Sequence, residues 1–235
     1  MSAPIPAQQP EGRKFSIMDV VEDTPTAEPL SEPTQSRMAT PSRSDVAGEY
    51  KRLKLLDAIA SGEAFDKNDG YTSMNQGTKD DKIIGSKDSA KHILGDRDLT
   101  DLTLRELLEF QKLPNGHKNR IFAAGRYQII PTTMEYAIDR SGLSLDDKFS
   151  PENQDKLALT LAIKARPKLA KFLSGESNDI DSAMLDLAKE WASFPVPSGE
   201  KAGESYYGDG NSARHSVEET RKILLEAREE LSKQG

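Results

Sequence analysis

The sequence predicts an all-α domain behind a disordered N-terminal tail, and one small hairpin would make that domain α+β. Apolar residues recur at the i, i+3, i+4 and i+7 spacing of a helix in six segments, all beyond residue 47. Helix-start signals precede several of these segments, either as Ser or Thr three residues before Glu or as proline in the first turn. Strand signals are few.

The tail is predicted from composition. Seven of the 13 prolines but only one of the 14 aromatic residues, Phe15, fall in the first 45 residues. Such a segment buries too little apolar surface to offset the entropy cost of ordering it. We therefore expect residues 1–47 to form a Pro-rich acidic tail and residues 48–235 to form one domain, which is long enough for a buried core.

The first helix of the domain is expected to end at Glu63, which continues an apolar face made by Tyr50, Leu53, Leu56, Ile59 and Ala60. A turn-rich stretch from Asp66 to Gly85 follows, and its Asn-Asp-Gly and Asn-Gln-Gly triplets favour a short hairpin. The later helices are expected after Thr103 with Glu106, from Pro131 to near Gly142, from Pro151 to before Pro167, from about Ile180 to Trp191, and after Ser216 with Glu219.

The net charge of −7 argues against nucleic acid as a partner. The first 45 residues carry four basic and seven acidic residues, so the domain holds −4, whereas a phosphate backbone requires a basic surface. Without cysteine there is no disulfide or thiolate chemistry, and the three histidines lack metal-ligand spacing. We expect no metal and no cofactor. No stretch approaches the roughly 18 apolar residues of a membrane span, and the N-terminus lacks the apolar core of a signal peptide.

Glu63 is the first candidate for chemistry. It lies one turn beyond Ile59 on the apolar face of its helix, and the chain then opens into a loop. A carboxyl group in such a position is partly desolvated, and desolvation raises its pKa toward the range of a general acid near neutral pH. The alternative is a solvated glutamate at a frayed helix end.

Two loops carry the planar hydrogen-bonding groups and aromatic faces that recognise sugars. In residues 123–133, small residues are followed by Arg-Tyr-Gln and a proline-started helix, although an ordinary connection between helices would also fit. In residues 191–211, Trp191 and Phe194 suit the core, whereas the tyrosine pair beside glycines suits a surface. The substrate-binding residues we expect are Tyr71, Tyr127, Gln128, Tyr206 and Tyr207.

Four segments carry a family resemblance when they are taken in order: Leu55 to Glu63 (LLDAIASGE), Ala124 to Gln128 (AGRYQ), Phe149 to Asp155 (FSPENQD) and Trp191 to Pro195 (WASFP). Together they resemble the lambda-type phage endolysins, within the lysozyme and lytic transglycosylase superfamily, over about residues 50–230. The resemblance implies a lysozyme-like fold that cleaves peptidoglycan between N-acetylmuramic acid and N-acetylglucosamine. It also implies that Glu63 is the catalytic acid/base, that Tyr127 and Gln128 line the glycan cleft, and that Tyr206 or Tyr207 lies beside the acid.

The sequence departs from phage patterns in two places. Asp81 to Lys118 has no counterpart that we can place in the lambda type. A second phage muramidase pattern sets Asp nine residues and Thr fifteen residues after the glutamate, and here those positions are Thr72 and Thr78. The missing aspartate favours the lytic transglycosylase route, in which Glu63 acts alone and the muramic 6-hydroxyl closes a 1,6-anhydro ring, as the resemblance also implies. A hydrolytic muramidase would need Asp66 or Asp69 as its second acid.

An enzyme of this kind, made in the host cytoplasm without a signal peptide, would reach the periplasm and cell wall after holin release or by delivery in the virion. For delivery, the apolar cluster from Phe15 to Val21 is a candidate contact with another virion protein. A protein of another class would keep the lysozyme-like fold as a catalytically silent virion module, against which the intact Glu63 argues.

Overall fold

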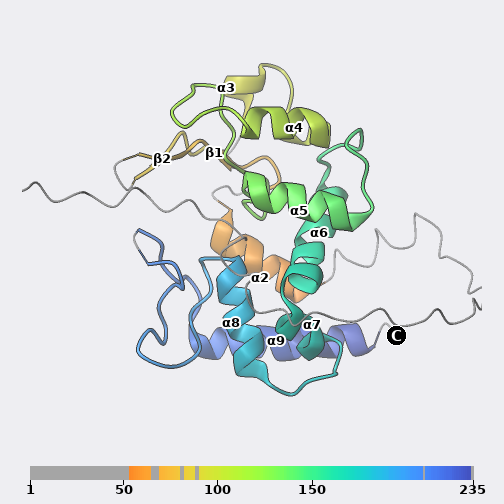
Figure 1. The fold of residues 1–235 in the computed structure, drawn as a ribbon, viewed down its shortest axis with the longest axis vertical. Coiled ribbons are helices and arrows are strands. Elements are labelled where there is room, and N and C mark those ends of the chain that lie inside the picture. Colours follow the sequence, from red (N-terminus) through yellow and green to blue (C-terminus); the bar gives the residue numbers. More distant parts are fainter. Residues whose placement is uncertain (1–52, 65–68, 80–81, 88–89, 209, 234–235) are drawn as a thin grey trace, which may run out of the picture. The chain divides into compact units, whose positions relative to one another are not determined.

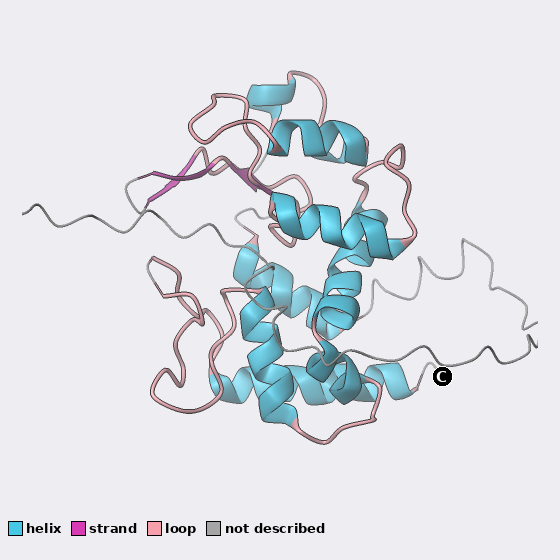
Figure 2. Ribbon diagram, viewed as in Figure 1, coloured by secondary structure: helices cyan, strands magenta, loops and turns pink. Residues whose placement is uncertain are grey.

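The computed structural model describes residues 53–64, 69–79, 82–87, 90–208 and 210–233. Within these residues the chain forms eight α-helices and two pairs of short strands (Figure 2). The predicted class, mostly helical with a small β element, is confirmed. None of the described helices combines the length and apolarity needed to cross a membrane. The tail, with its cluster from Phe15 to Val21, lies outside the described residues, as does Tyr50.

The helices are α2 (Lys54–Glu63), α3 (Lys91–Leu94), α4 (Leu104–Gln111), α5 (Pro131–Ser141), α6 (Pro151–Thr160), α7 (Pro167–Leu173), α8 (Ile180–Glu190) and α9 (Val217–Ser232). A 3-10 turn, Leu99–Asp101, precedes α4, and a π-helical turn, Leu161–Ala165, continues α6. All six predicted helices are present. The sequence did not predict α3, α7 or the 3-10 turn.

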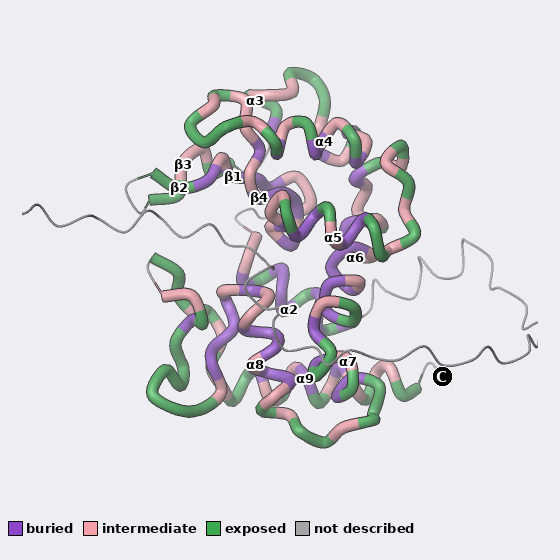
Figure 3. The backbone as a smooth tube through the Cα atoms, viewed as in Figure 1, coloured by how far each residue is buried: buried purple, intermediate pink, exposed green. Residues whose placement is uncertain are grey.

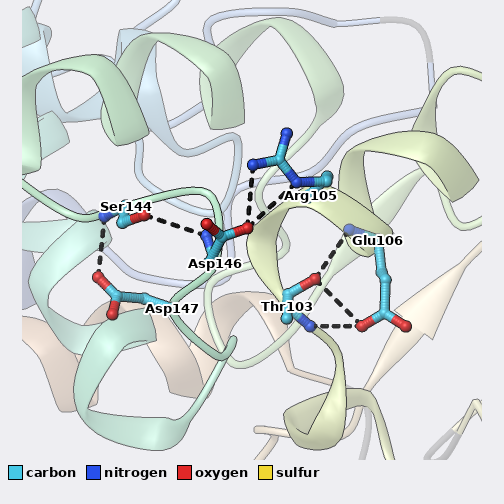
Figure 4. Close-up of polar contacts among 6 residues, drawn as sticks. All are labelled: Thr103, Arg105, Glu106, Ser144, Asp146 and Asp147. Atoms are coloured by element: carbon cyan, nitrogen blue, oxygen red, sulfur yellow. Dashed lines mark hydrogen bonds and ion pairs between the residues drawn. The ribbon is translucent and has the colours of Figure 1, made fainter.

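The predicted caps form as expected. The Thr103 hydroxyl accepts a hydrogen bond from the Glu106 N–H, and the Glu106 carboxylate accepts one from the Thr103 N–H, which closes the capping box of α4 (Figure 4). Beside it, Arg105 donates from two nitrogens to Asp146 in the loop before α6, whose turn is closed by the Ser144 N–H donating to Asp147. Ser216 and Glu219 form the box of α9.

The helices pack as two groups joined by α2 and α6. Helices α7, α8 and α9 contact one another, α4 contacts α5, and α5 contacts α6. Helix α2 contacts both α9 and α6, and Figure 1 shows α2 and α6 between the two groups. One continuous hydrophobic core links them and includes Ile59 of α2, Leu157 of α6 and Leu224 of α9. Figure 3 shows long buried stretches in α2 and α6.

The strands form two antiparallel pairs. β2 (Gly77–Lys79) and β3 (Lys82–Ile84) make the predicted hairpin, with Thr78 opposite Ile83. β1 (Met74–Asn75) pairs with β4 (Ala123–Ala124), with Asn75 opposite Ala123. The β1–β4 pair was not predicted, because two-residue strands leave no alternating pattern. It brings the turn after α2 against the loop of residues 123–130.

Candidate active site

Glu63 ends α2 and is partly buried. Its Oε1 accepts a hydrogen bond of 3.2 Å from the backbone N–H of Ser193. Burial raises the pKa of Glu63, and hydrogen bonding from Ser193 together with the positive charge of Arg214 opposes that rise. The carboxyl group is therefore placed to hold a proton and also to carry a charge, as an acid/base must.

The loop after α8 packs directly on the last turn of α2. A Cβ on Gly62 would lie 2.5 Å from both Cβ and Oγ of Ser193, so only glycine permits this approach. Ser193 is held in turn, because its carbonyl accepts hydrogen bonds from the N–H groups of Arg214 and His215. The His215 ring hydrogen-bonds the carbonyl of Ala58 in α2. Three segments thus fix the position of the Glu63 carboxylate.

Tyr71 and Tyr127 share one buried acceptor. Their hydroxyl groups donate to Oδ1 of Asp155 in α6 at 2.9 and 2.7 Å. Burial, followed by the negative charge of Asp155, raises the pKa of both tyrosines, so both stay protonated as donors. Tyr127 is only 2% exposed. The structure therefore places the Tyr127 ring in the core rather than facing a glycan, whereas Tyr71 is partly exposed.

Arg126 connects this pair of tyrosines to α2. Its guanidinium lies 5.1 Å from the ring centre of Tyr71 and 5.9 Å from that of Tyr127. Its Nη2 forms an ion pair of 2.6 Å with Asp57 in α2. From the sequence, Arg126 and Asp155 were noted only as members of the AGRYQ and FSPENQD segments. The structure assigns both a positioning role, since they tie α2, the turn at residues 69–71 and α6 together.

Gln128 lies in the loop that follows Gly125. Gly125 has a φ of +74°, and a Cβ there would lie 2.2 Å from the Gln154 side-chain oxygen, so a larger residue is excluded. Gln128 itself has a φ of +47°, an uncommon conformation for a non-glycine residue that is enriched at functional sites. Its amide donates to the Gly125 carbonyl and accepts from Asn75, which orients the partly exposed side chain. Sequence reasoning missed Asn75, because the β1–β4 pairing alone brings it here.

The second tyrosine pair lies at the end of α8. Tyr206 is 39% exposed, and its ring meets that of Tyr207 edge-on at 5.3 Å. The Tyr207 hydroxyl donates to the Lys189 carbonyl. Pro195 and Ser205 pair across this loop, so Tyr206 follows a segment anchored two residues from Ser193. Trp191 and Phe194 are 4% and 0% exposed, which confirms them as core residues.

A family model described as Endolysin matches residues 53–213, about two thirds of the chain. The chain belongs to the endolysin family. Members of this family are phage enzymes that degrade peptidoglycan. The match runs through Asp81 to Lys118, the segment that the sequence comparison could not place. No curated protein and no solved structure matches the chain.

A hydrolytic endolysin would need one second carboxylate beside Glu63, for which Asp66 and Asp69 are the candidates. Asp69 has a φ of +60°, its side chain is 83% exposed, and its carboxylate lies 4.0 Å from the Arg126 guanidinium. Asp66 lies outside the described residues. Within the described part of the chain, no group of three or more His, Cys, Asp or Glu side chains could hold a metal ion.

Proposed function

We propose that this endolysin cleaves the glycan strand between N-acetylmuramic acid and N-acetylglucosamine, as a lytic transglycosylase with Glu63 as its acid/base. One observation carries the proposal. Glu63 presents a partly buried carboxyl group at the end of α2, its pKa is raised by burial, and the Ser193 N–H holds its Oε1. A carboxyl group in this setting is protonated more readily than one in water.

The proposed reaction uses this single carboxyl group twice. Glu63 first gives its proton to the oxygen between the two sugars, and the bond from that oxygen to C1 of the muramic acid breaks. The substrate's N-acetyl group stabilises the positive charge that develops at C1. The Glu63 carboxylate then takes the proton of the 6-hydroxyl, whose oxygen bonds to C1 and closes the 1,6-anhydro ring. The Ser193 N–H and the charge of Arg214 support the anionic form between the two proton transfers.

Gln128 and Tyr206 are the best placed of the expected sugar contacts. The Gln128 amide is partly exposed and held in a fixed orientation by Asn75 and Gly125, and Tyr206 offers an exposed aromatic face. Tyr71 is partly exposed near the turn after α2 and is a further candidate. We assign Tyr127 and Tyr207, whose hydroxyls are engaged with Asp155 and Lys189, to supporting these contacts rather than to touching the sugar.

The runner-up is a hydrolytic muramidase with Asp69 or Asp66 as the second acid. The Asp69 carboxylate is solvated and lies 4.0 Å from the Arg126 guanidinium, so it is less suited to such a role than a buried and oriented group would be. The products separate the two reactions. We expect mass spectrometry of digested glycan to show 1,6-anhydromuramic ends, each one water molecule lighter than the hydrolytic product. Reducing muramic ends alone would establish hydrolysis instead.

The domain boundary gives a second test. We propose that residues 48–235 suffice for catalysis and that residues 1–47, through Phe15 to Val21, contact a virion protein when the enzyme is delivered with the particle. Deleting residues 1–45 should leave the rate of glycan cleavage within about twofold of the full chain, because the contacts that the described residues make around Glu63 come from Ser193 and His215. Turbidity loss of outer-membrane-stripped cells measures this rate. Loss of activity or of folding in the truncated chain would show that the tail belongs to the catalytic domain.

A further inference from the structure

Arg120 has a guanidinium that is partly buried beside the β1–β4 strand pair. It lies 4.6 Å from the ring centre of Phe122, and its Nη1 donates to the Asn115 side chain at 3.0 Å. Its Nε is buried without a hydrogen-bond partner. Gly77 leaves space for the guanidinium because it has no side chain, and a Cβ there would lie only 3.1 Å from Nη1. The side chain is thus held from three directions in a place where its charge is partly desolvated.

No described carboxylate lies within ion-pair distance of Arg120. Most other described arginines do have such a partner, namely Arg97, Arg105, Arg126, Arg140, Arg166 and Arg221. Burial lowers the pKa of the Arg120 guanidinium, and among the described residues no neighbouring charge offsets this effect. A partly buried cation without a counterion is costly, and an anionic ligand would remove that cost.

The position of Arg120 relates it to the expected glycan contact. Gly77, which it touches, donates its N–H to the side chain of Asn75, and Asn75 donates in turn to Gln128. The N–H of Phe122, the residue under the guanidinium, donates to the Asn75 carbonyl. The Asn75 side chain therefore links Gln128 to the Gly77 backbone, which lies beside the Arg120 guanidinium.

We propose that Arg120 binds a carboxylate of the peptide stem that branches from the muramic acid of the substrate. The inference rests on the proposed function, since it concerns the same glycan strand. The backbone sugars of this strand are neutral, and the free carboxylates of peptidoglycan belong to its peptide branches. A guanidinium can hold a carboxylate with two parallel hydrogen bonds, which a neutral hydroxyl does not match. Arg120 then selects glycan strands that carry peptides.

The test compares intact peptidoglycan with glycan strands whose peptides have been removed by an amidase and whose lactyl carboxylates, which this cleavage frees on the muramic acid, have then been converted to methyl amides. On intact material, Arg120→Gln should lower kcat/KM about tenfold, as expected for loss of a hydrogen bond to a charged group. On peptide-free strands, the variant and the unmodified enzyme should have equal kcat/KM. Equal rates there also show that the variant is folded. Arg120→Lys should fall between the two on intact material, because it keeps the charge but loses the paired donors.

Arg228 provides a matched control. Its guanidinium lies 5.0 Å from the ring centre of Phe172 and its Nη1 donates to the Asn178 side chain at 3.0 Å, so it shares the ring and amide contacts of Arg120 but not the buried Nε without a partner. Arg228→Gln should leave kcat/KM unchanged on both substrates. If Arg120→Gln loses activity equally on intact and peptide-free strands, or on neither, Arg120 does not bind the peptide. If the unmodified enzyme cleaves neither substrate, the proposed function itself fails, so the two failures are distinct.

Discussion

Replacing Glu63 by Gln should reduce glycan cleavage to near the background rate. General acid/base catalysis by one side chain contributes about 10²–10⁴-fold, and we expect the upper end because one carboxyl group serves both proton transfers. Gln keeps the size of the side chain and can still accept the hydrogen bond from the Ser193 N–H, but it has no proton to give at neutral pH. The measurement is the initial rate of release of soluble glycan fragments from purified cell walls.

The fold of this variant should be unaffected, because the contacts of Gly62 with Ser193 and of His215 with Ala58 do not involve the carboxylate. Its melting temperature should match that of the unmodified enzyme. Asp69→Asn is the paired control, and it should retain activity because the exposed Asp69 takes no part in the proposed reaction. Near-normal cleavage by Glu63→Gln with unchanged melting would mean that another residue supplies the proton.

Local signals explain which helices could be predicted. The boxes at Thr103 and Ser216 and the start at Pro131 are each complete within four residues, so the sequence contains the whole cap. Helix α7 is different. Its first free N–H groups, at Lys168 and Leu169, donate to Asp186 of α8, which lies 18 and 17 residues farther along the chain. Pro167 lies in the first turn of α7, as Pro131 does in α5, but it also predicts the end of the preceding helix, and the cap from Asp186 leaves no nearby pattern that decides between the two.

The same distinction applies to the candidate site. The position of Glu63 at the end of its helix could be predicted because it continues the apolar face of that helix. The roles of Asp155 and Asn75 depend on tertiary contacts, with α6 brought to the turn after α2 and β1 paired with β4. Tyrosine is a residue type that often contacts sugars, yet the hydrogen bond from the Tyr127 hydroxyl to Asp155 holds the Tyr127 ring in the core. Residue type alone therefore does not predict the direction in which each side chain points.

A buried ion pair supports the segment that carries Ser193. Arg166 and Glu190 lie 2.8 Å apart, with side chains only 6% and 4% exposed, and Arg166 also donates to the Lys189 carbonyl. The Tyr207 hydroxyl donates to the same carbonyl. These contacts fix the end of α8 immediately before the loop that reaches Glu63. Burial raises the pKa of Glu190 although Arg166 opposes the rise, which reflects the cost of removing both charges from water.

Glu190→Ala should therefore be strongly destabilising. Removing one partner leaves the Arg166 guanidinium buried without a counterion, and the loss of such a partner costs about 3–5 kcal/mol. Denaturant unfolding of the variant would measure the free energy of unfolding. Asp181→Ala is the matched control, since its pair with Arg221 is exposed and such surface pairs contribute about 0–1 kcal/mol.

The double variant Arg166→Met, Glu190→Leu should regain much of the loss, because apolar side chains replace both charges. A Glu190→Ala cost no larger than that of Asp181→Ala would mean that the end of α8 opens to water and solvates Arg166, and that this pair does not hold the loop against Glu63.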